Sequence, residues 1–248
     1  MEKIILLERY ADSQRLGREE AAIMHYAIME RKKYTFVDEL ALIDAKKKYN
    51  QRIELFVGSV EAMRIINNGV LPQPDYYPLP LIDHFKNRNV RTGTIKDAKK
   101  LVANGSAVFL KPRNHWKTFT GFVARDSSDF DQIVDVEDQD VWLSDVIDIK
   151  CEFRAYVCEN ELLAVCQYTA EEDYEPNINI INASIKTLSD AGYAFSTYAI
   201  DFALTNGDEF VPLEMNNAFA IGKYKGISDK NFYNFLKAGF DCIQKKHA

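Results

Sequence analysis

Residues 198–216 read YAIDFALTNGDEFVPLEMN, and this stretch decides the fold class of the second half of the chain. Apolar residues alternate with other residues in Tyr198–Leu204 and again in Glu209–Asn216. Between these segments lies Thr205-Asn206-Gly207-Asp208, the strongest turn signal of the sequence. The pattern predicts two antiparallel strands joined by a four-residue loop, with one apolar face toward a core and the other face open.

The open face of this hairpin carries acidic and amide side chains. With a four-residue loop, Asp201 falls opposite Pro212 and becomes a diagonal neighbour of Glu214, roughly 6–8 Å away. Asn216 lies one step further on the same side, and only alanines flank Asp201 on that face. Two carboxylates and a carboxamide are hard oxygen ligands that suit Mg²⁺. We therefore predict a metal site, the alternative being that the carboxylates line a solvated sheet face.

Three cations in earlier segments are candidate anion ligands. Lys111 ends an apolar strand and Lys117 follows six residues later, so the two roots of one hairpin loop can direct both ammonium groups at one phosphate. Exposed loop lysines are the alternative interpretation. Arg154 lies in a strand among apolar residues, where it either pairs with a carboxylate or receives a charged ligand. Glu152, two positions earlier on the same strand face, is its obvious structural partner.

The N-terminal third predicts a different architecture. Its strand candidates are Lys3–Leu7, Tyr34–Val37 and Glu54–Val57, and its helix candidates are Arg18–Arg31 and Val60–Asn67. This alternation favours a small doubly wound α/β layer. Four of the seven prolines then fall in residues 71–81, which predicts a linker. Beyond residue 107, adjacent antiparallel strands with helices set apart predict an α+β arrangement.

The turn Gly58-Ser59 precedes the second helix candidate of this layer and has two interpretations. A helix N-terminus after a strand can bind a phosphate group through its free backbone N–H groups. The other interpretation is a plain tight turn without a ligand.

The composition is that of an ordinary globular protein and argues against several classes. The 248 residues include 31 Lys and Arg against 37 Asp and Glu, a net charge of −6, with 47% apolar and 27% charged residues. The acidic balance argues against nucleic acid as the main partner. The longest apolar run near the N-terminus, Ile4–Leu7, is much shorter than a membrane-spanning helix of about 18 residues or the core of a signal peptide. We therefore expect no membrane association and a cytoplasmic location.

The order of the charged residues resembles the ATP-grasp superfamily. Leu110-Lys111-Pro112 is followed by Lys117 with Phe119-Thr120-Gly121, then by residues 142–146, Glu152-x-Arg154, Asp201 and Glu214-x-Asn216. The similarity is closest to the clade characterised by one arginine and two lysines, and it spans roughly residues 54–226. It implies an ATP-grasp fold of the α+β class, in which two α+β subdomains at residues 83–147 and 148–248 clasp ATP. A small α/β pre-ATP-grasp domain would occupy residues 1–82.

The resemblance also implies roles for individual residues. Lys111 and Lys117 would contact the nucleotide phosphates, backbone groups of Ser144, Asp145, Val146 and Ile147 would meet adenine at a hinge between the subdomains, and Glu152 would bind ribose. Arg154 would hold the γ-phosphate or a developing acyl phosphate, and Arg154 and Lys117 are the catalytic candidates. Asp201, Glu214 and Asn216 match the Mg²⁺ ligands.

One segment departs from the better-known members of the superfamily. The loop between Lys111 and Lys117 has no glycine, so side chains such as Arg113 would cover the phosphates in place of a glycine-rich loop. The segment after Asn216 lies where an acceptor substrate would approach. Tyr168, Asn217 and Lys223 are the candidates for that site.

The activity that the resemblance implies is an ATP- and Mg²⁺-dependent ligase. A carboxylate would attack the γ-phosphate to give an acyl phosphate and ADP, and an amine would then displace phosphate to form an amide. The carboxylate and the amine could belong to amino acids, peptides or proteins. Two alternatives remain open at this point: a catalytically silent nucleotide-binding module that acts on a partner, and an ATP-dependent kinase of the same fold.

Overall fold

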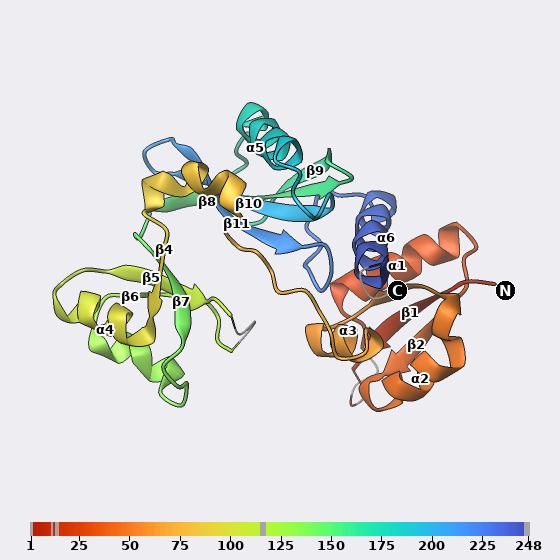
Figure 1. Cartoon of the computed structure of the whole chain (residues 1–248). Helices are drawn as coiled ribbons and strands as arrows, with labels where there is room; N and C mark the ends of the chain where they lie inside the picture. Colours follow the sequence, from red (N-terminus) through yellow and green to blue (C-terminus); the bar gives the residue numbers. More distant parts are fainter. Residues whose placement is uncertain (1, 11, 13–14, 115–117, 246–248) are drawn as a thin grey trace.

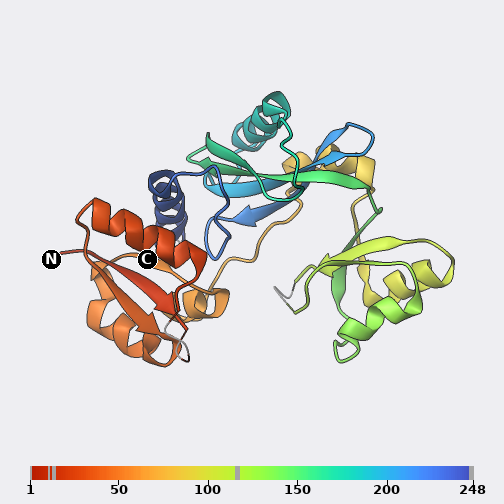
Figure 2. The same ribbon diagram turned by 180° about the vertical axis from the view of Figure 1, so that it is seen from behind.

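A computed structural model of the chain describes residues 2–10, 12, 15–114 and 118–245. Over these residues it contains three β-sheets, one of three strands near the N-terminus and two of four strands. Figure 1 shows the sheet of residues 91–144 on one side of the molecule and the N-terminal sheet on the other, with the sheet of residues 149–217 between them; Figure 2 shows the same order from behind. None of the helices in the described ranges combines the length and apolar character that a membrane crossing demands.

The N-terminal unit is a parallel three-stranded sheet with strand order β2-β1-β3. Its elements are β1 (Ile4–Arg9), α1 (Arg18–Met29), β2 (Tyr34–Asp38), α2 (Leu42–Tyr49), β3 (Ile53–Val57) and α3 (Val60–Ile66). Ile5, Leu6 and Leu7 of the central strand are fully buried, as expected for a parallel strand covered on both faces. The predicted α/β layer is therefore present. Helix α2 was not predicted from the sequence, because its three consecutive lysines weaken the apolar pattern.

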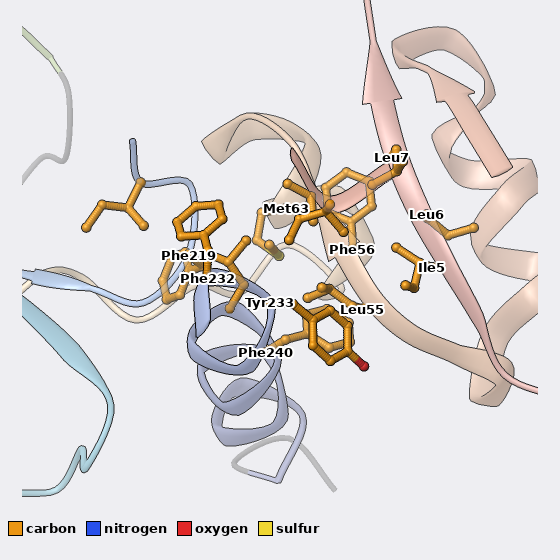
Figure 3. Packing of buried hydrophobic residues seen from close by; sticks show 14 of the residues in the cluster. Ile5, Leu6, Leu7, Leu55, Phe56, Met63, Phe219, Phe232, Tyr233 and Phe240 are labelled. Carbon is orange, nitrogen blue, oxygen red and sulfur yellow. The ribbon is translucent and has the colours of Figure 1, made fainter. Parts of the chain in front are cut away.

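The last helix of the chain completes the core of this unit. Helix α6 (Asp229–Lys245) lies against α1 and β3, and Figure 3 shows its residues Tyr233 and Phe240 among the side chains of the N-terminal sheet. The rings of Tyr26 and Tyr233 stack with their centroids 4.4 Å apart. The first and last parts of the chain therefore share one hydrophobic core.

The second unit is an antiparallel sheet with strand order β4-β7-β5-β6. Its elements are β4 (Arg91–Thr94), α4 (Ile95–Ala103), β5 (Val108–Pro112), β6 (Phe122–Ala124) and β7 (Asp140–Ser144). Thr94 and Asp97 form a capping box that fixes the start of α4. Strand β7 ends at Ser144, so the following residues leave the sheet and lead into the third unit.

The third unit is an antiparallel sheet with strand order β11-β10-β8-β9. Its elements are β8 (Ile149–Cys158), β9 (Glu161–Gln167), α5 (Ile178–Asp190), β10 (Tyr198–Thr205) and β11 (Phe210–Asn217), with the 3₁₀ segment η3 (Leu79–Arg88) packed beside them. Ile181 of α5 and Phe85 of η3 bury one face of the sheet together with Ile200 of β10. The opposite face carries the charged residues of β8 and β10. The α+β class predicted from the sequence is confirmed.

The register of the β10–β11 hairpin differs from the prediction in two ways. Thr205 already pairs with Glu209 through a hydrogen bond of 2.9 Å from its backbone N–H, so the turn is one residue shorter than expected. A β-bulge at Leu213 then adds one unpaired residue to β11. As a result Asp201 lies directly opposite Glu214, and the prediction that it lies opposite Pro212 is wrong. Because two one-residue changes add up to the two-residue period of a strand, both carboxylates stay on the predicted face.

Candidate functional site

A buried ion pair lies at the centre of the third sheet. Arg154 of β8 and Asp201 of β10 are paired across the two strands. The guanidinium donates from Nε to Oδ1 and from Nη2 to Oδ2, both at 2.7 Å, and the two side chains are only 10% and 4% exposed. This bidentate geometry is the strong form of an arginine–carboxylate contact. Burial raises the pKa of Asp201 above its usual range, and the two hydrogen bonds from Arg154 oppose that rise.

A second ion pair joins this sheet to the sheet of β4–β7. Lys111 of β5 is buried, and its Nζ donates a hydrogen bond to the carboxylate of Glu214 on β11. The same Nζ lies 3.3 Å from the ring centroid of Tyr76, close enough for a cation–π contact. Burial alone would raise the pKa of Glu214, but the charge and the hydrogen bond of Lys111, with a hydrogen bond from Asn216, lower it. The pair therefore connects two units that share no strand.

Asn216 brings the two ion pairs together. Its Nδ2 lies 3.0 Å from Glu214 Oε1 and 3.4 Å from Asp201 Oδ2. We call Lys111, Arg154, Asp201, Glu214 and Asn216 the ion-pair cluster. Two of the three cations predicted from the sequence and all three predicted metal ligands belong to it.

The donor set of the ion-pair cluster fits Mg²⁺. The two carboxylates are direct cross-strand partners, and the carboxamide of Asn216 lies within hydrogen-bond distance of both, so three oxygen-bearing groups converge. Nowhere in the described part of the chain do three or more His, Cys, Asp or Glu side chains gather as metal ligands. Mg²⁺ is commonly held by one or two carboxylates, with water and substrate phosphates in its other positions, so a set with two carboxylates is sufficient.

A pocket of about 240 Å³ opens beside the ion-pair cluster, and we call it the cluster pocket. Asp145, Val146 and Ile147 line one side of it, and Asp201 and Glu214 line another. The segment between β7 and β8 and the two carboxylates thus face one space, as the resemblance implied.

Ser144 holds this segment in place from outside the pocket. Its hydroxyl accepts a hydrogen bond of 3.1 Å from Arg88 Nη2 and donates one of 3.2 Å to the carbonyl of Asp145. Arg88 also donates from Nη1 to the carbonyl of Leu213 at 2.7 Å, which ties the segment to the bulge in β11. Arg88 was not predicted from the sequence, because it lies at the end of a helical segment without a recognisable motif.

Glu152 and Tyr168 also line the cluster pocket. The ring of Tyr168 stacks on Tyr224 with centroids 4.5 Å apart, and the Arg154 guanidinium carbon lies 5.6 Å from the first centroid and 5.1 Å from the second. Burial, together with the charges of Asp201 and Glu152, raises the pKa of the Tyr168 hydroxyl, so this phenol stays neutral. Tyr168 was predicted as an acceptor residue, and it lies against the arginine of the ion-pair cluster.

The other predicted residues lie elsewhere or outside the described part. Asn217 donates from Nδ2 to the carbonyl of Pro72 at 2.9 Å, and the Lys223 ammonium pairs with Asp229 at 3.2 Å, so neither side chain lines the cluster pocket. The Arg113 guanidinium lies 5.2 Å from the ring centroid of Trp142. Lys117, predicted to be catalytic and to contact phosphate, lies outside the described residues.

The known structures that this chain resembles share its fold at low sequence identity. It is similar to the RimK domain protein ATP-grasp from Sphaerobacter thermophilus, with 15% identity over 97% of this chain and 98% of the other, at a TM-score of 0.53. For the D-alanine–D-alanine ligase of Bacillus anthracis complexed with ATP the values are 10%, 98%, 99% and 0.55. For the N5-carboxyaminoimidazole synthase of Aspergillus clavatus they are 13%, 97%, 77% and 0.57. No curated protein matches the sequence.

A family model gives the more specific result. The model describes an ATP-grasp domain, family 2 of the clade named for one arginine and two lysines. It matches residues 85–235, more than half of the chain and the whole ion-pair cluster. The ATP-grasp fold and the clade resemblance expected from the sequence are both confirmed. The chain therefore belongs to family 2 of the one-arginine, two-lysine clade of ATP-grasp domains.

Proposed function

We propose that this protein is an ATP- and Mg²⁺-dependent ligase that joins a carboxylate to an amine through an acyl phosphate. The observation that carries the proposal is the ion-pair cluster, in which two buried cations and three oxygen-bearing side chains meet beside one pocket. Structural neighbours with this fold include ligases, one of them complexed with ATP. The described residues contribute no nucleophile of their own to the proposed reaction, since the substrate carboxylate itself attacks the γ-phosphate.

The ion pairs of the cluster give each residue a role in binding. Asp201, Glu214 and Asn216 would hold Mg²⁺, which when bound supplies positive charge to the phosphates. The carboxylates would then no longer balance Arg154 and Lys111, and both cations would become available to phosphate oxygens. The protein thus keeps its phosphate-binding cations charged, positioned and shielded from water before the nucleotide arrives.

The reaction that follows needs positioning and charge neutralisation. A substrate carboxylate oxygen would bond to the γ-phosphorus as the bond to ADP breaks, and Arg154 would contact the transferred phosphoryl group. The amine nitrogen would then bond to the acyl carbon, phosphate would leave, and the amine would lose a proton. Residues 145–147 would border the adenine and Glu152 the ribose, both within the cluster pocket. Lys117 remains a predicted second lysine for the phosphates.

The test is a product screen with the purified full chain. Mg²⁺, ATP and mixed amino acids and peptides are incubated with the protein, and mass spectrometry searches for a mass equal to two substrates minus water. We expect ADP and phosphate to form only when both a carboxylate and an amine are present. AMP and pyrophosphate would contradict the acyl-phosphate route, a phosphorylated product formed without an amine would indicate a kinase, and ATP binding without turnover would indicate a silent module.

Matched variants connect the product to the cluster. We expect Asp201→Asn and Lys111→Ala to lower turnover by about 10²–10³-fold, because each removes a charge that would stabilise the transferring phosphoryl group. Asp208→Asn removes a carboxylate that is 80% exposed on the same hairpin, and Lys100→Ala removes an exposed lysine of the β4–β7 unit. Both control variants should keep full activity, and equal losses in all four would contradict the assignment.

A further inference from the structure

A second and larger cavity lies between the N-terminal unit and the segment that follows β11. It has a volume of about 680 Å³, within the range of small-molecule sites. Phe56, Met63 and Phe219 form part of its apolar wall, and Figure 3 shows these three side chains in the core around α6. No residue of the ion-pair cluster lines this cavity, so it is a separate space.

The polar wall of this cavity is almost entirely acidic, and we call it the acidic cavity. Its charged lining residues within the described ranges are Glu8, Asp12, Glu19, Glu20, Glu39 and Arg9. The single guanidinium is already engaged, because Arg9 donates from Nε and Nη2 to the two oxygens of Asp38, at 2.5 Å and 3.3 Å. The cavity therefore presents five carboxylates and no free positive charge among the described residues.

Two of these carboxylates have structural partners. Glu8 accepts hydrogen bonds from the backbone N–H of Ser59 at 2.5 Å and from its hydroxyl at 3.3 Å. A side-chain carboxylate therefore occupies the helix N-terminus at Gly58-Ser59, where a phosphate was one of the two interpretations of the sequence. Glu19 accepts a hydrogen bond of 2.8 Å from the backbone N–H of Lys223.

Glu20 is different, since it is buried without a partner. It is only 9% exposed, and no other described residue donates a hydrogen bond to its carboxylate or pairs with it. Burial, with a smaller contribution from the charges of Glu19 and Glu8, raises its pKa to about 7. Its position in the first turn of α1 favours an acidic residue through the helix dipole, but that effect needs no burial. A buried carboxylate that lines a cavity and has no cation is a destabilising arrangement unless a ligand supplies the charge.

We propose that the acidic cavity binds the amine substrate of the ligase as its ammonium form, with Glu20 as the central counter-ion. This inference rests on the proposed function and names the class of one substrate. The cavity fits an amine without a nearby carboxylate, such as a peptide N-terminus, a lysine side chain or a simple amine, because a free amino acid would place its own carboxylate among five others. A metal ion fits less well, since no three of these carboxylates converge as ligands.

The acidic cavity borders the ion-pair cluster through one short segment. Residues 219–222 line the cavity, and Tyr224 two positions later lies against the Arg154 guanidinium. Tyr156 fixes this segment, because its hydroxyl donates to the carbonyl of Gly222 at 2.8 Å and accepts from the backbone N–H of Tyr224 at 3.2 Å. An amine held in the cavity is thus one loop away from the arginine that would contact the acyl phosphate.

The experiment measures binding to the full chain by titration calorimetry without ATP. The probes are L-alaninamide, which has an ammonium and no carboxylate, L-alanine, which has both, and N-acetyl-L-alaninamide, which has neither. We expect L-alaninamide to bind at least about tenfold more tightly than the other two, the effect of a single favourable ion pair of about 1.4 kcal/mol.

Variants test the role of Glu20. Glu20→Gln should weaken L-alaninamide binding by about tenfold, whereas Glu30→Gln, an exposed carboxylate at the other end of α1, should leave it unchanged. Glu39→Gln, at an exposed position of the cavity wall, should give a smaller loss of about twofold, and it decides the question if Glu20→Gln does not fold.

Each outcome separates the inference from the proposed function. Equal affinity for the three probes, an unchanged affinity in Glu20→Gln, or no binding of L-alaninamide at any concentration would overturn the inference. Amide formation from ATP in the presence of such a result would leave the ligase proposal intact. Binding of L-alaninamide that depends on Glu20, with no ATP turnover for any substrate pair, would contradict the ligase proposal and leave an ammonium site.

Discussion

The cluster pocket and the acidic cavity treat buried carboxylates in opposite ways. In the first, Asp201 is bonded to Arg154 and Glu214 to Lys111, so each negative charge has a cation within the protein. In the second, Glu20 is buried with no cation among the described residues. A paired charge can exchange its partner for a ligand of either sign, whereas an unpaired charge favours only a ligand of the opposite sign. The comparison indicates a site for a metal–anion complex in one place and a site for a cation in the other.

The largest expected effect comes from breaking the Arg154–Asp201 pair. Asp201→Ala leaves a guanidinium that is 10% exposed with no carboxylate, and loss of one member of a buried pair typically costs about 3–5 kcal/mol. We expect the free energy of unfolding in urea to fall by that amount.

Two controls sharpen this measurement. The double variant Arg154→Met with Asp201→Leu removes both charges and should recover most of the lost stability, because no uncompensated charge remains. Asp208→Ala, at an exposed position on the same hairpin, should change stability by less than about 0.5 kcal/mol. If the single Asp201 variant is as stable as the parent, the pair has no structural importance.

The next effect concerns the ligands of the cluster pocket. Because binding of either ligand alone would break a pair and leave one charge uncompensated, Mg²⁺ and ATP should stabilise the protein more together than the sum of their separate effects. At ligand concentrations near one hundred times the dissociation constant the gain is about 3 kcal/mol. The melting temperature with EDTA, with Mg²⁺, with ATP and with both measures this difference. Purely additive shifts would argue against partner exchange.

Glu20 should make the protein less stable as the pH rises. Its pKa is about 7 in the folded state and 4.5 in the unfolded state, so between these values the unfolded chain loses a proton that the folded chain keeps. The free energy of unfolding therefore decreases from about pH 4.5 to pH 7, by about 2–3 kcal/mol from this residue alone. Glu20→Gln should be more stable than the parent at pH 8 and nearly equal to it at pH 4.5, measured by urea unfolding at both values. A destabilised variant at pH 8 would mean that a cation already compensates the carboxylate.

The smallest effect compares two helix caps. The Ser59 hydroxyl accepts a hydrogen bond of 3.1 Å from the backbone N–H of Ala62 and also contacts Glu8 in the acidic cavity. Ser59→Ala should cost about 1 kcal/mol, as should Thr94→Ala at the start of α4. Only the first should change the affinity for L-alaninamide, since only Ser59 lies at the cavity. Urea unfolding and calorimetry of both variants test this, and equal binding would exclude any influence of the cap on Glu8.

The sequence predicted the positions that converge more reliably than their exact contacts. The alternation in residues 198–216 placed Asp201, Glu214 and Asn216 on one face, because a strand has a strict two-residue period. The same pattern could not show the shorter turn or the bulge at Leu213, since several loop lengths satisfy one turn signal. Arg154 was left with two interpretations, and the nearest carboxylate in sequence, Glu152, was not the partner that the neighbouring strand supplies.

Contacts between distant units were outside the reach of local patterns. Lys111 was identified as an anion ligand, but its contact with Glu214 joins two sheets whose relative position no local motif encodes. Glu20 gave no signal at all, because an acidic residue in the first turn of a helix is ordinary and its burial depends on how the chain after β11 covers it.

The bulge at Leu213 has a practical use for work on this protein. It divides the β10–β11 hairpin into a distal part, whose alignment follows the turn, and a proximal part, whose alignment follows the pairing of β10 with β8. A fluorophore or an inserted affinity tag at residues 206–208 would therefore alter the distal part while Asp201 stays aligned with Arg154. The hairpin tip thus offers an attachment point for surface immobilisation or energy-transfer measurements with an intact centre.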